Sequence, residues 1–182
     1  NSEFRSSDVE SLASISKIND SDELVNPYFF SIPASPFTAA KKLNVEIDLS
    51  LVYSAYDKLS SIHDCLLVEG IGGIMTPIKS DYTVCNLIKE LRLSVIIVCD
   101  SKIGTVNHTM MTCKMCELYG IPITGIVINS VTKNGYDVNE LSDDLEELTG
   151  KPVLCSIQHV ENFELEKFIE IFSKNIKLEK FL

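Results

Sequence analysis

The stretch "SVIIVCD" at residues 94–100 is a short apolar run, rich in β-branched residues, that ends in an acid. Runs of this kind, without polar alternation, are typical of strands that are buried on both faces of a parallel sheet. Three more runs share this character: they are "CLLVE" (65–69), "TGIVINS" (124–130) and "PVLCSI" (152–157). We therefore expect four buried parallel strands.

Helical periodicity fills the chain between these runs. Helices are predicted at 83–92, 106–120 and 139–148, and a longer one from about Asp48 to Ile62 precedes the first run. Asp48 is a candidate N-cap and Gly120 a candidate C-cap. A last helix is predicted at about 162–177, with its apolar residues on one stripe: Leu165, Phe168, Ile169, Phe172 and Ile176. Strands that alternate with helices predict an α/β fold with a mainly parallel sheet.

The N-terminal third has a different character. Residues 26–38 contain three prolines and are interpreted as an irregular loop. Before them, Ser7 or Asp8 followed by Glu10 is a capping signal for a helix within 6–18. A length of 182 residues is enough for one domain with its own core, so a single domain over 1–182 is expected.

Composition argues against several classes of partner. The formal net charge is −10, and the 16 Lys and Arg residues form no stripe that would hold a nucleic-acid backbone. No apolar run reaches the roughly 18 residues that a membrane-spanning helix needs. The six cysteines lie mostly in apolar patterns, which favours free thiols in a reducing cytoplasm. Cys113 and Cys116 form a C-x-x-C pair, but no second pair or His cluster accompanies it, so a zinc or redox role is not favoured.

Polar and small residues follow the ends of the predicted strands. They are Glu69 to Gly73, Asp100 to Gly104, Asn129 with Ser130, and Gln158 with His159. In an open parallel sheet, ligands bind beyond the carboxyl ends of the strands. A binding site is therefore predicted at this edge.

Each candidate also has a structural explanation. Glu69 could bind Mg²⁺ while its glycines bring backbone N–H groups to an anion, but an ordinary turn explains the same letters about equally well. Asp8 is more simply a helix N-cap. Asn129 could cap a loop or read the edge of a base. Asn107 and His108 could mark the start of a helix and nothing more. That helix start would also present free N–H groups that suit a carboxylate.

Several motifs resemble those of the dethiobiotin synthetases, over about residues 6–160. In order, they are "SSDVESL", "VNPYFF…ASPFTAA", "VEGIGGIMTPI", "DYTVCNLIKEL", "SVIIVCDSKIGTVNHTMMT" and "GIVINSV". The resemblance implies a three-layer, P-loop NTPase-like α/β fold with helices on both faces of the sheet. It also implies a magnesium- and ATP-dependent ligase of biotin biosynthesis that acts in the cytoplasm as a homodimer.

The resemblance also implies a reaction. 7,8-Diaminononanoate and CO₂ form a carbamate, ATP phosphorylates it to a carbamic–phosphoric anhydride, and the second amine closes the ring of dethiobiotin with release of phosphate. The implied Mg²⁺ ligands are Asp8 and Glu69, and the segment that receives the substrate carboxylate from the neighbouring subunit is Gly104, Thr105, Val106 and Asn107. The implied ATP-binding residues are Asp8, Glu69, Gly70, Ile71, Gly72, Asn129, Ser130, Gln158, His159 and Val160.

The sequence departs from the family in several ways. No G-x-x-x-x-G-K-[ST] pattern occurs in the 182 residues, so the family's P-loop and catalytic lysines have no counterparts among them. In the family, the strand that leads into the P-loop lies within the sheet, so its absence would expose apolar strand edges. We therefore expect these residues alone not to fold stably. Ile71 stands where the family usually has Ala, and Asn86 where many relatives have Asp. Two alternatives remain: another P-loop enzyme, such as an amidoligase or a partitioning-type ATPase, and a non-catalytic remnant that binds a partner or a small ligand.

Overall fold

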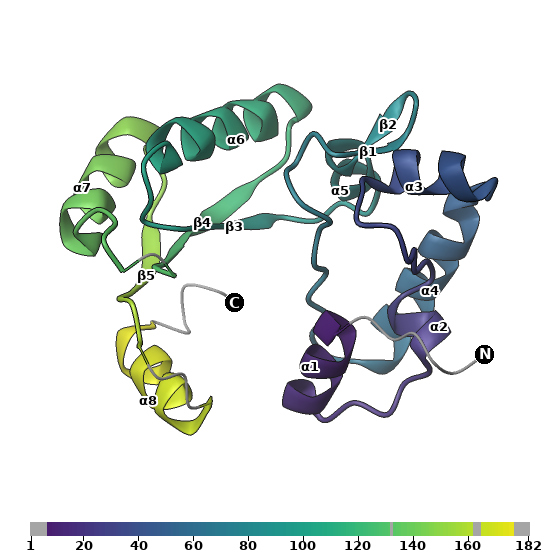
Figure 1. The fold of residues 1–182 in the computed structure, drawn as a ribbon, viewed down its shortest axis with the longest axis horizontal. Coiled ribbons are helices and arrows are strands. Elements are labelled where there is room, and N and C mark those ends of the chain that lie inside the picture. Colours follow the sequence, from purple (N-terminus) through teal and green to yellow (C-terminus); the bar gives the residue numbers. More distant parts are fainter. Residues whose placement is uncertain (1–6, 132, 162–164, 177–182) are drawn as a thin grey trace. The chain divides into compact units, whose positions relative to one another are not determined.

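The computed structural model describes residues 7–131, 133–161 and 165–176. Its chain divides into two compact units, Asn1–Val84 and Cys85–Leu182, and each is described here by itself (Figure 1). The expectation of a single domain over residues 1–182 stays a prediction.

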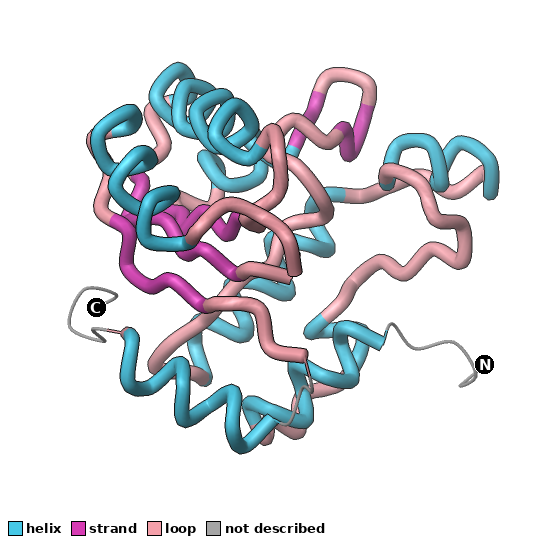
Figure 2. Tube along the Cα trace, turned by 60° about the vertical axis from the view of Figure 1, so that its left-hand side comes forward, coloured by secondary structure: helices cyan, strands magenta, loops and turns pink. Residues whose placement is uncertain are grey.

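The second unit is built on a parallel sheet. Strands β3 (Val95–Cys99), β4 (Ile123–Asn129) and β5 (Val153–Ile157) pair in the order β3-β4-β5, and Figure 2 shows them side by side. Helix α6 (Thr105–Tyr119) connects β3 to β4, and α7 (Val138–Thr149) connects β4 to β5. Three of the four predicted strands are thereby confirmed, together with the helices between them.

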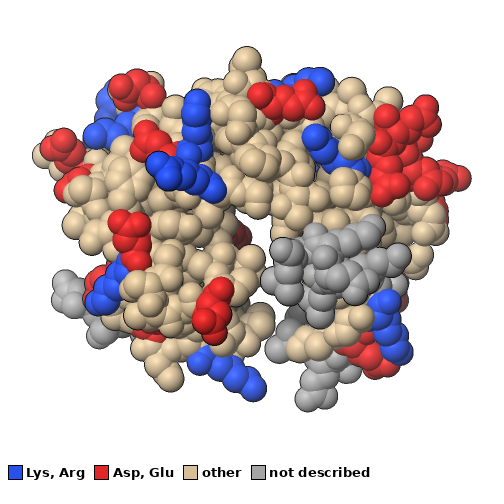
Figure 3. Space-filling view, turned by 180° about the vertical axis from the view of Figure 1, so that it is seen from behind, with Lys and Arg blue, Asp and Glu red and all other residues tan. Residues whose placement is uncertain are grey.

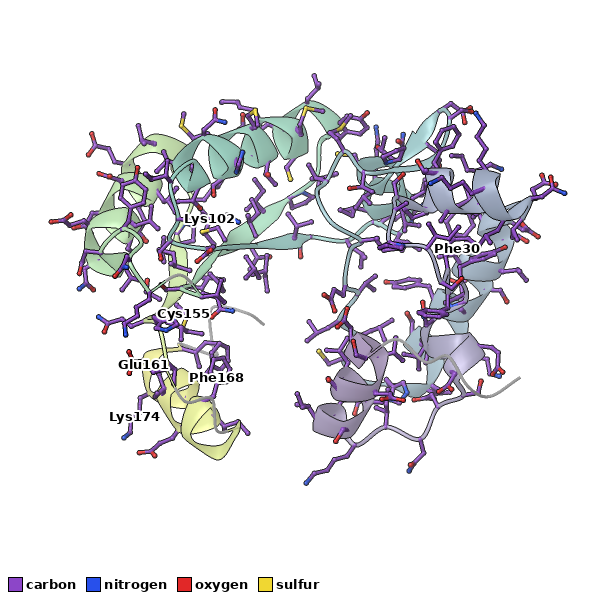
Figure 4. The ribbon with its side chains drawn as sticks, viewed as in Figure 1. Phe30, Lys102, Cys155, Glu161, Phe168 and Lys174 are labelled. Carbon is purple, nitrogen blue, oxygen red and sulfur yellow. The ribbon has the colours of Figure 1, made fainter. Side chains whose placement is uncertain are left out.

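Helices cover both faces of this sheet, as expected for an α/β fold. Ile126 and Ile128 of β4 are fully buried on one face, where they belong to one core cluster with residues of α6 and α7: Cys113, Val138, Leu141 and Leu145. Val127 lies between them in sequence and points to the other face. There it joins a core that includes Cys155 of β5 and Phe168 of α8 (Leu165–Asn175), both labelled in Figure 4. The alternation along β4 therefore divides the core into two layers.

The predicted helix ends are confirmed where the structure shows their caps. Gly120 has φ 68° and donates its N–H to the carbonyls of Cys116 and Glu117, which closes α6. The Asp48 carboxylate accepts a hydrogen bond from the Ser50 N–H and begins α4 (Leu49–Ile62). Helix α5 (Val84–Glu90) confirms the helix predicted at 83–92.

The first unit contains elements that the sequence did not predict. Besides α1 (Ser7–Ser16) and α4, it has α2 (Asp22–Val25), α3 (Pro36–Leu43) and an antiparallel hairpin of β1 (Pro77–Lys79) and β2 (Tyr82–Thr83). The loop predicted at 26–38 ends early because α3 already begins at Pro36. Ser35 caps this helix by accepting the Thr38 N–H, and proline at the first helical position needs no hydrogen-bond partner.

The strand predicted at 65–69 is wrong. These residues form an extended segment without strand pairing in the described structure, and Leu67 is 86% exposed. An apolar run becomes a strand only when a neighbouring backbone satisfies its N–H and C=O groups. No described strand pairs with this run, so its apolar letters alone did not decide its structure.

The predicted apolar stripe of the last helix holds only in part. On α8, Phe168, Phe172 and the following Ile176 pack against the core, whereas Ile169 is exposed. The predicted residues 162–164 and 177 lie outside the described part of the chain.

Candidate nucleotide and substrate site

The carboxyl ends of β4 and β5 bring several predicted site residues together. Asn129, the last residue of β4, is in register with Ile157, the last residue of β5. Gln158, His159 and Val160 follow β5 directly, so they leave the sheet beside Asn129. The parallel ladder thus places at one edge residues that are about thirty positions apart.

A half-open groove of about 470 Å³ lies at this edge. Gln158, His159 and Val160 line it, together with residues that the sequence did not single out: Asn139, Ser156, Glu161 and Ile171. Asn139 sits in the first turn of α7, where Asp137 caps the helix by accepting the Asn139 and Glu140 N–H groups. The only sequence signal for Asn139 was its place two residues after a possible helix cap, Asp137. Glu161, labelled in Figure 4, pairs with Lys133 of the loop after β4.

Ser130 has its polar groups engaged within the protein. The residue is 8% exposed, its hydroxyl lies 2.6 Å from that of Ser101, and its N–H donates to the Ile157 carbonyl. These contacts suit a residue that holds its neighbour Asn129 better than one whose side chain reaches a nucleotide. Sequence reasoning missed Ser101, because a serine after a strand carries no signal for a partner 29 positions away.

Asp100 connects the ends of β3 and β4. Its Oδ1 accepts hydrogen bonds from the Ser101 N–H at 2.7 Å and from the Val131 N–H at 3.1 Å. One carboxylate oxygen therefore holds the chain that leaves β3 and the chain that leaves β4. The sequence predicted that Asp100 lies at the sheet edge but not this contact.

The predicted carboxylate-binding segment forms the start of α6. Gly104 has φ 94°, a left-handed conformation that favours glycine, and no side chain caps the helix at this residue. Thr105 is buried, Val106 is half-buried and Asn107 is exposed. A helix start of this kind presents backbone N–H groups and a favourable dipole to an anion.

The two predicted metal carboxylates belong to the first unit. Asp8 is the second residue of α1, so its interpretation as the N-cap is wrong, because the helix has already begun at Ser7. Glu69 lies in the extended segment before a turn in which Gly72 has φ 73°. Both side chains are exposed, and carboxylate oxygens suit a hard cation such as Mg²⁺. The chemistry of this pair fits Mg²⁺, and the assignment stays a prediction.

The described residues contain neither a cluster of metal-ligating side chains nor a membrane-spanning helix. No three His, Cys, Asp or Glu side chains gather as a metal site in the described ranges. None of the helices described is long and apolar enough to cross a membrane. On the face shown in Figure 3, the described Lys and Arg side chains lie in small groups among Asp and Glu.

All six cysteines are free thiols. Four are buried, Cys99 is half-buried, and Cys65 is exposed because its segment joins no sheet. Burial raises the pKa of the Cys116 thiol to about 11, so this thiol is neutral at ordinary pH. Buried neutral thiols behave as small apolar side chains, as the apolar patterns around most of the six predicted. The reducing cytoplasm stays a prediction.

Comparison with known proteins first defines the fold. The crystal structure of a ParA family ATPase from Chlorobium tepidum TLS is similar, with a TM-score of 0.52, 19% sequence identity, and coverage of 99% of this chain and 71% of that chain. At this identity the likeness defines the fold alone, a P-loop NTPase-like α/β fold. A family model described as "AAA domain" matches residues 2–167.

Sequence relatives define the family within that fold. The protein named ATP-dependent dethiobiotin synthetase BioD in Nitrosopumilus maritimus is 49% identical over 98% of this chain and 78% of the relative. Proteins of the same name are 33% identical in Bacillus subtilis strain 168, over 94% of this chain and 75% of the relative, and 37% identical in Clostridium kluyveri, over 86% and 66%. The chain belongs to the dethiobiotin synthetase family of ATP-dependent ligases.

Proposed function

We propose that the protein to which these residues belong carries out the dethiobiotin synthetase reaction. 7,8-Diaminononanoate, CO₂ and ATP give dethiobiotin, ADP and phosphate. The observation that carries the proposal is the edge of the sheet at β4 and β5. There Asn129 lies in register with Ile157, and the three residues after Ile157 line a groove. This arrangement lies within a chain that is 49% identical to a named dethiobiotin synthetase.

The groove is the proposed place for adenine. Asn129 ends the neighbouring strand β4 and is not among the residues that line the groove. Its amide offers a donor and an acceptor side by side, which suits the edge of a base that extends from the groove. Gln158, His159 and Val160 flank the base from the walls of the groove. Ser130 contributes by fixing Asn129, since its own hydroxyl is bonded to Ser101.

The exposed acids and glycines of the first unit serve the phosphates. Asp8 and Glu69 would hold Mg²⁺, whose charge neutralises phosphate oxygens when it is bound. Gly70, Ile71 and Gly72 would approach the phosphates through their backbone, and the positive φ of Gly72 suits such a turn. The Ile71 side chain is exposed to solvent, so it is not packed against the backbone that would approach the phosphates.

The start of α6 is the proposed site for the substrate carboxylate, in a homodimer. The segment Gly104, Thr105, Val106 and Asn107 would bind it at the start of the helix, where the Thr105 N–H already donates to the Lys102 carbonyl, and would serve the active site of the neighbouring subunit. Ile103 and Leu118, before and near the end of α6, are 89% and 76% exposed, and Met111 between them is also exposed. Apolar side chains along the outer side of this helix suit contact with a second copy of the chain.

The chemistry then proceeds by phosphoryl transfer and ring closure. One substrate amine takes up CO₂ as a carbamate, and a carbamate oxygen accepts the γ-phosphoryl group of ATP. The second amine attacks the resulting carbamic–phosphoric anhydride and expels phosphate, which closes the ring. The residues named above act by positioning the reactants and neutralising charge. The free thiols support a cytoplasmic location for this reaction.

A phosphate-release assay on the full-length gene product tests the proposal. We expect release to require both ATP and diaminononanoate, and Asn129→Ala to raise the KM for ATP about tenfold because a base contact is lost. Asn19→Ala, which removes an exposed amide from the first unit, is the matched control. Phosphate release that does not depend on diaminononanoate would refute the proposed function.

A further inference from the structure

Two buried serines and a half-buried aspartate join the two loops that leave β3 and β4. We call Asp100, Ser101 and Ser130 the polar bridge. The Ser101 and Ser130 hydroxyls lie 2.6 Å apart and the two residues are 0% and 8% exposed. The Asp100 carboxylate accepts the N–H groups of Ser101 and Val131. The Ser101–Ser130 hydroxyl pair and the bond from the Val131 N–H to Asp100 therefore connect the two loops twice.

The loop before α7 also closes over Ser101. The Tyr136 N–H donates to the Ser101 carbonyl at 2.7 Å. Gly135 passes so close that a Cβ there would lie 2.6 Å from the Ser101 carbonyl oxygen, and closer still to the hydroxyl. The Ser101 side chain is therefore confined from two sides, and its hydroxyl has little freedom to leave Ser130.

The polar bridge connects two segments with different proposed ligands. Asn129, the proposed adenine contact, immediately precedes Ser130. Gly104, where the proposed carboxylate site begins, follows Ser101 by only three residues, and a turn in which the Thr105 N–H donates to the Lys102 carbonyl spans that interval. A movement of either segment therefore displaces the residues of the polar bridge or breaks the hydrogen bonds between them.

We propose that the polar bridge couples nucleotide binding to binding of the substrate carboxylate, with Asp100, Ser101 and Ser130 as positioning residues. A nucleotide that fixes Asn129 also fixes Ser130, and through Ser101 it holds the start of α6 in the conformation that receives a carboxylate. Such coupling is reciprocal, so each ligand tightens the other by the same factor. This inference rests on the proposed function, because it assumes the two ligands at these two places.

The test measures this coupling factor in the full-length protein. Calorimetry gives the Kd of diaminononanoate with and without a saturating non-hydrolysable ATP analogue, and the Kd of the analogue with and without diaminononanoate. We expect each ligand to tighten the other about tenfold in the wild type. In Ser101→Ala, in Ser130→Ala and in the double variant, the factor should fall to about two or less. Since both serines form one bond, the double variant should lose no more coupling than either single variant.

Two matched variants separate coupling from simple stabilisation. Asp100→Asn keeps an oxygen that can accept both N–H groups and should retain the coupling factor, whereas Asp100→Ala should lose it. Ser173→Ala removes a hydroxyl that bonds only within its own helix α8, and it should leave the factor unchanged. If the double variant does not fold, the single variants decide the question.

The outcomes are distinct. Serine variants that melt at a lower temperature but keep the wild-type coupling factor would show a purely structural bridge and overturn the inference. A wild type that binds both ligands independently would overturn it as well, while leaving the proposed function intact. A wild type that binds neither ligand would overturn both.

Discussion

The strand ends of the second unit and the segment 63–73 of the first unit carry candidate site residues in very different surroundings. At the strand ends, Asn129 is held by register with β5 and Ser130 by two hydrogen bonds. Glu69 lies in an extended segment that pairs with no described strand. The structure anchors that segment at its start, where His63 ends α4 and lies 2.9 Å from the Asp20 carboxylate.

The difference shows what positions a functional side chain. A parallel ladder fixes the direction of each residue that leaves it, so the residues after β4 and β5 converge without any ligand. A carboxylate in an unpaired segment is placed by what it binds. The fold therefore directs the candidate site residues of the first unit less than it directs those of the second unit.

The largest expected effect is on catalysis, at Glu69. Glu69→Gln removes the charge from a proposed Mg²⁺ ligand, and we expect kcat/KM to fall about 100-fold or more, since even residues that only support metal ligands often matter by 10- to 100-fold. Steady-state assays over a range of Mg²⁺ concentrations measure this. Glu46→Gln, at another exposed acid of the first unit, is the control. Activity within about fivefold of the wild type would remove Glu69 from the metal site.

The next effect is on stability and compares two leucines. Leu141 of α7 is 0% exposed in the core over β4, whereas Leu67 of the unpaired segment is 86% exposed. Leu141→Ala should lower the free energy of unfolding by about 2–5 kcal/mol through lost burial and a cavity. Leu67→Ala should change it by about 0.5 kcal/mol or less. Urea unfolding of both variants provides the measurement.

A large loss at Leu67 would change the comparison itself. It would mean that the segment 65–69 is buried in solution, as the apolar letters first suggested. Equal losses at both positions would therefore contradict the structural difference between the two regions.

The two leucines also show why the sequence predicted the sheet of the second unit better than it predicted the segment 63–73. Apolar runs and helical periodicity were sufficient for β3, β4, β5 and α6, because each run finds a parallel partner within the second unit. The run at 65–69 has the same composition and no described partner, and strand pairing is a non-local property that a run does not contain. The site followed the same rule: Asn129 and Gln158 were placed correctly at the sheet edge, but the Ser101–Ser130 bond depends on register and left no local signal.

A smaller effect is expected from two glycines. A Cβ at Gly135 would collide with Ser101, whereas a Cβ at Gly73 meets no atom within 4 Å. Gly135→Ala should therefore lower the free energy of unfolding by about 1–3 kcal/mol. Gly73→Ala should be close to neutral, because the backbone there is open and alanine restricts the unfolded chain. Thermal unfolding of the two variants distinguishes them, and a tolerated Gly135→Ala would argue against the close packing of the loop on Ser101.

The smallest expected effect concerns how the first unit holds α4, the helix that leads into the unpaired segment. The pKa of the Asp48 carboxyl lies below its ordinary value of 3.8, first because of the side-chain hydrogen bond with Ser50 and then because of the Ser50 backbone N–H. A lowered pKa in the folded state means that the ionised form stabilises the fold above the unfolded pKa. This stabilisation is lost as the pH falls through the lower, folded pKa.

Asp48→Ala removes the cap while leaving the contacts between the Tyr28 hydroxyl and the Asp48 backbone available. We expect the variant to melt below the wild type at pH 7, by a margin that shrinks as the pH falls below about 3.8, where the wild-type carboxyl also becomes protonated. Scanning calorimetry at several pH values measures that margin. A margin that is the same at pH 7 and in acid would show that the charge of Asp48 does not hold α4. The start of the segment that carries Glu69 would then rest on the backbone contacts with Tyr28 and on the Asp20–His63 pair.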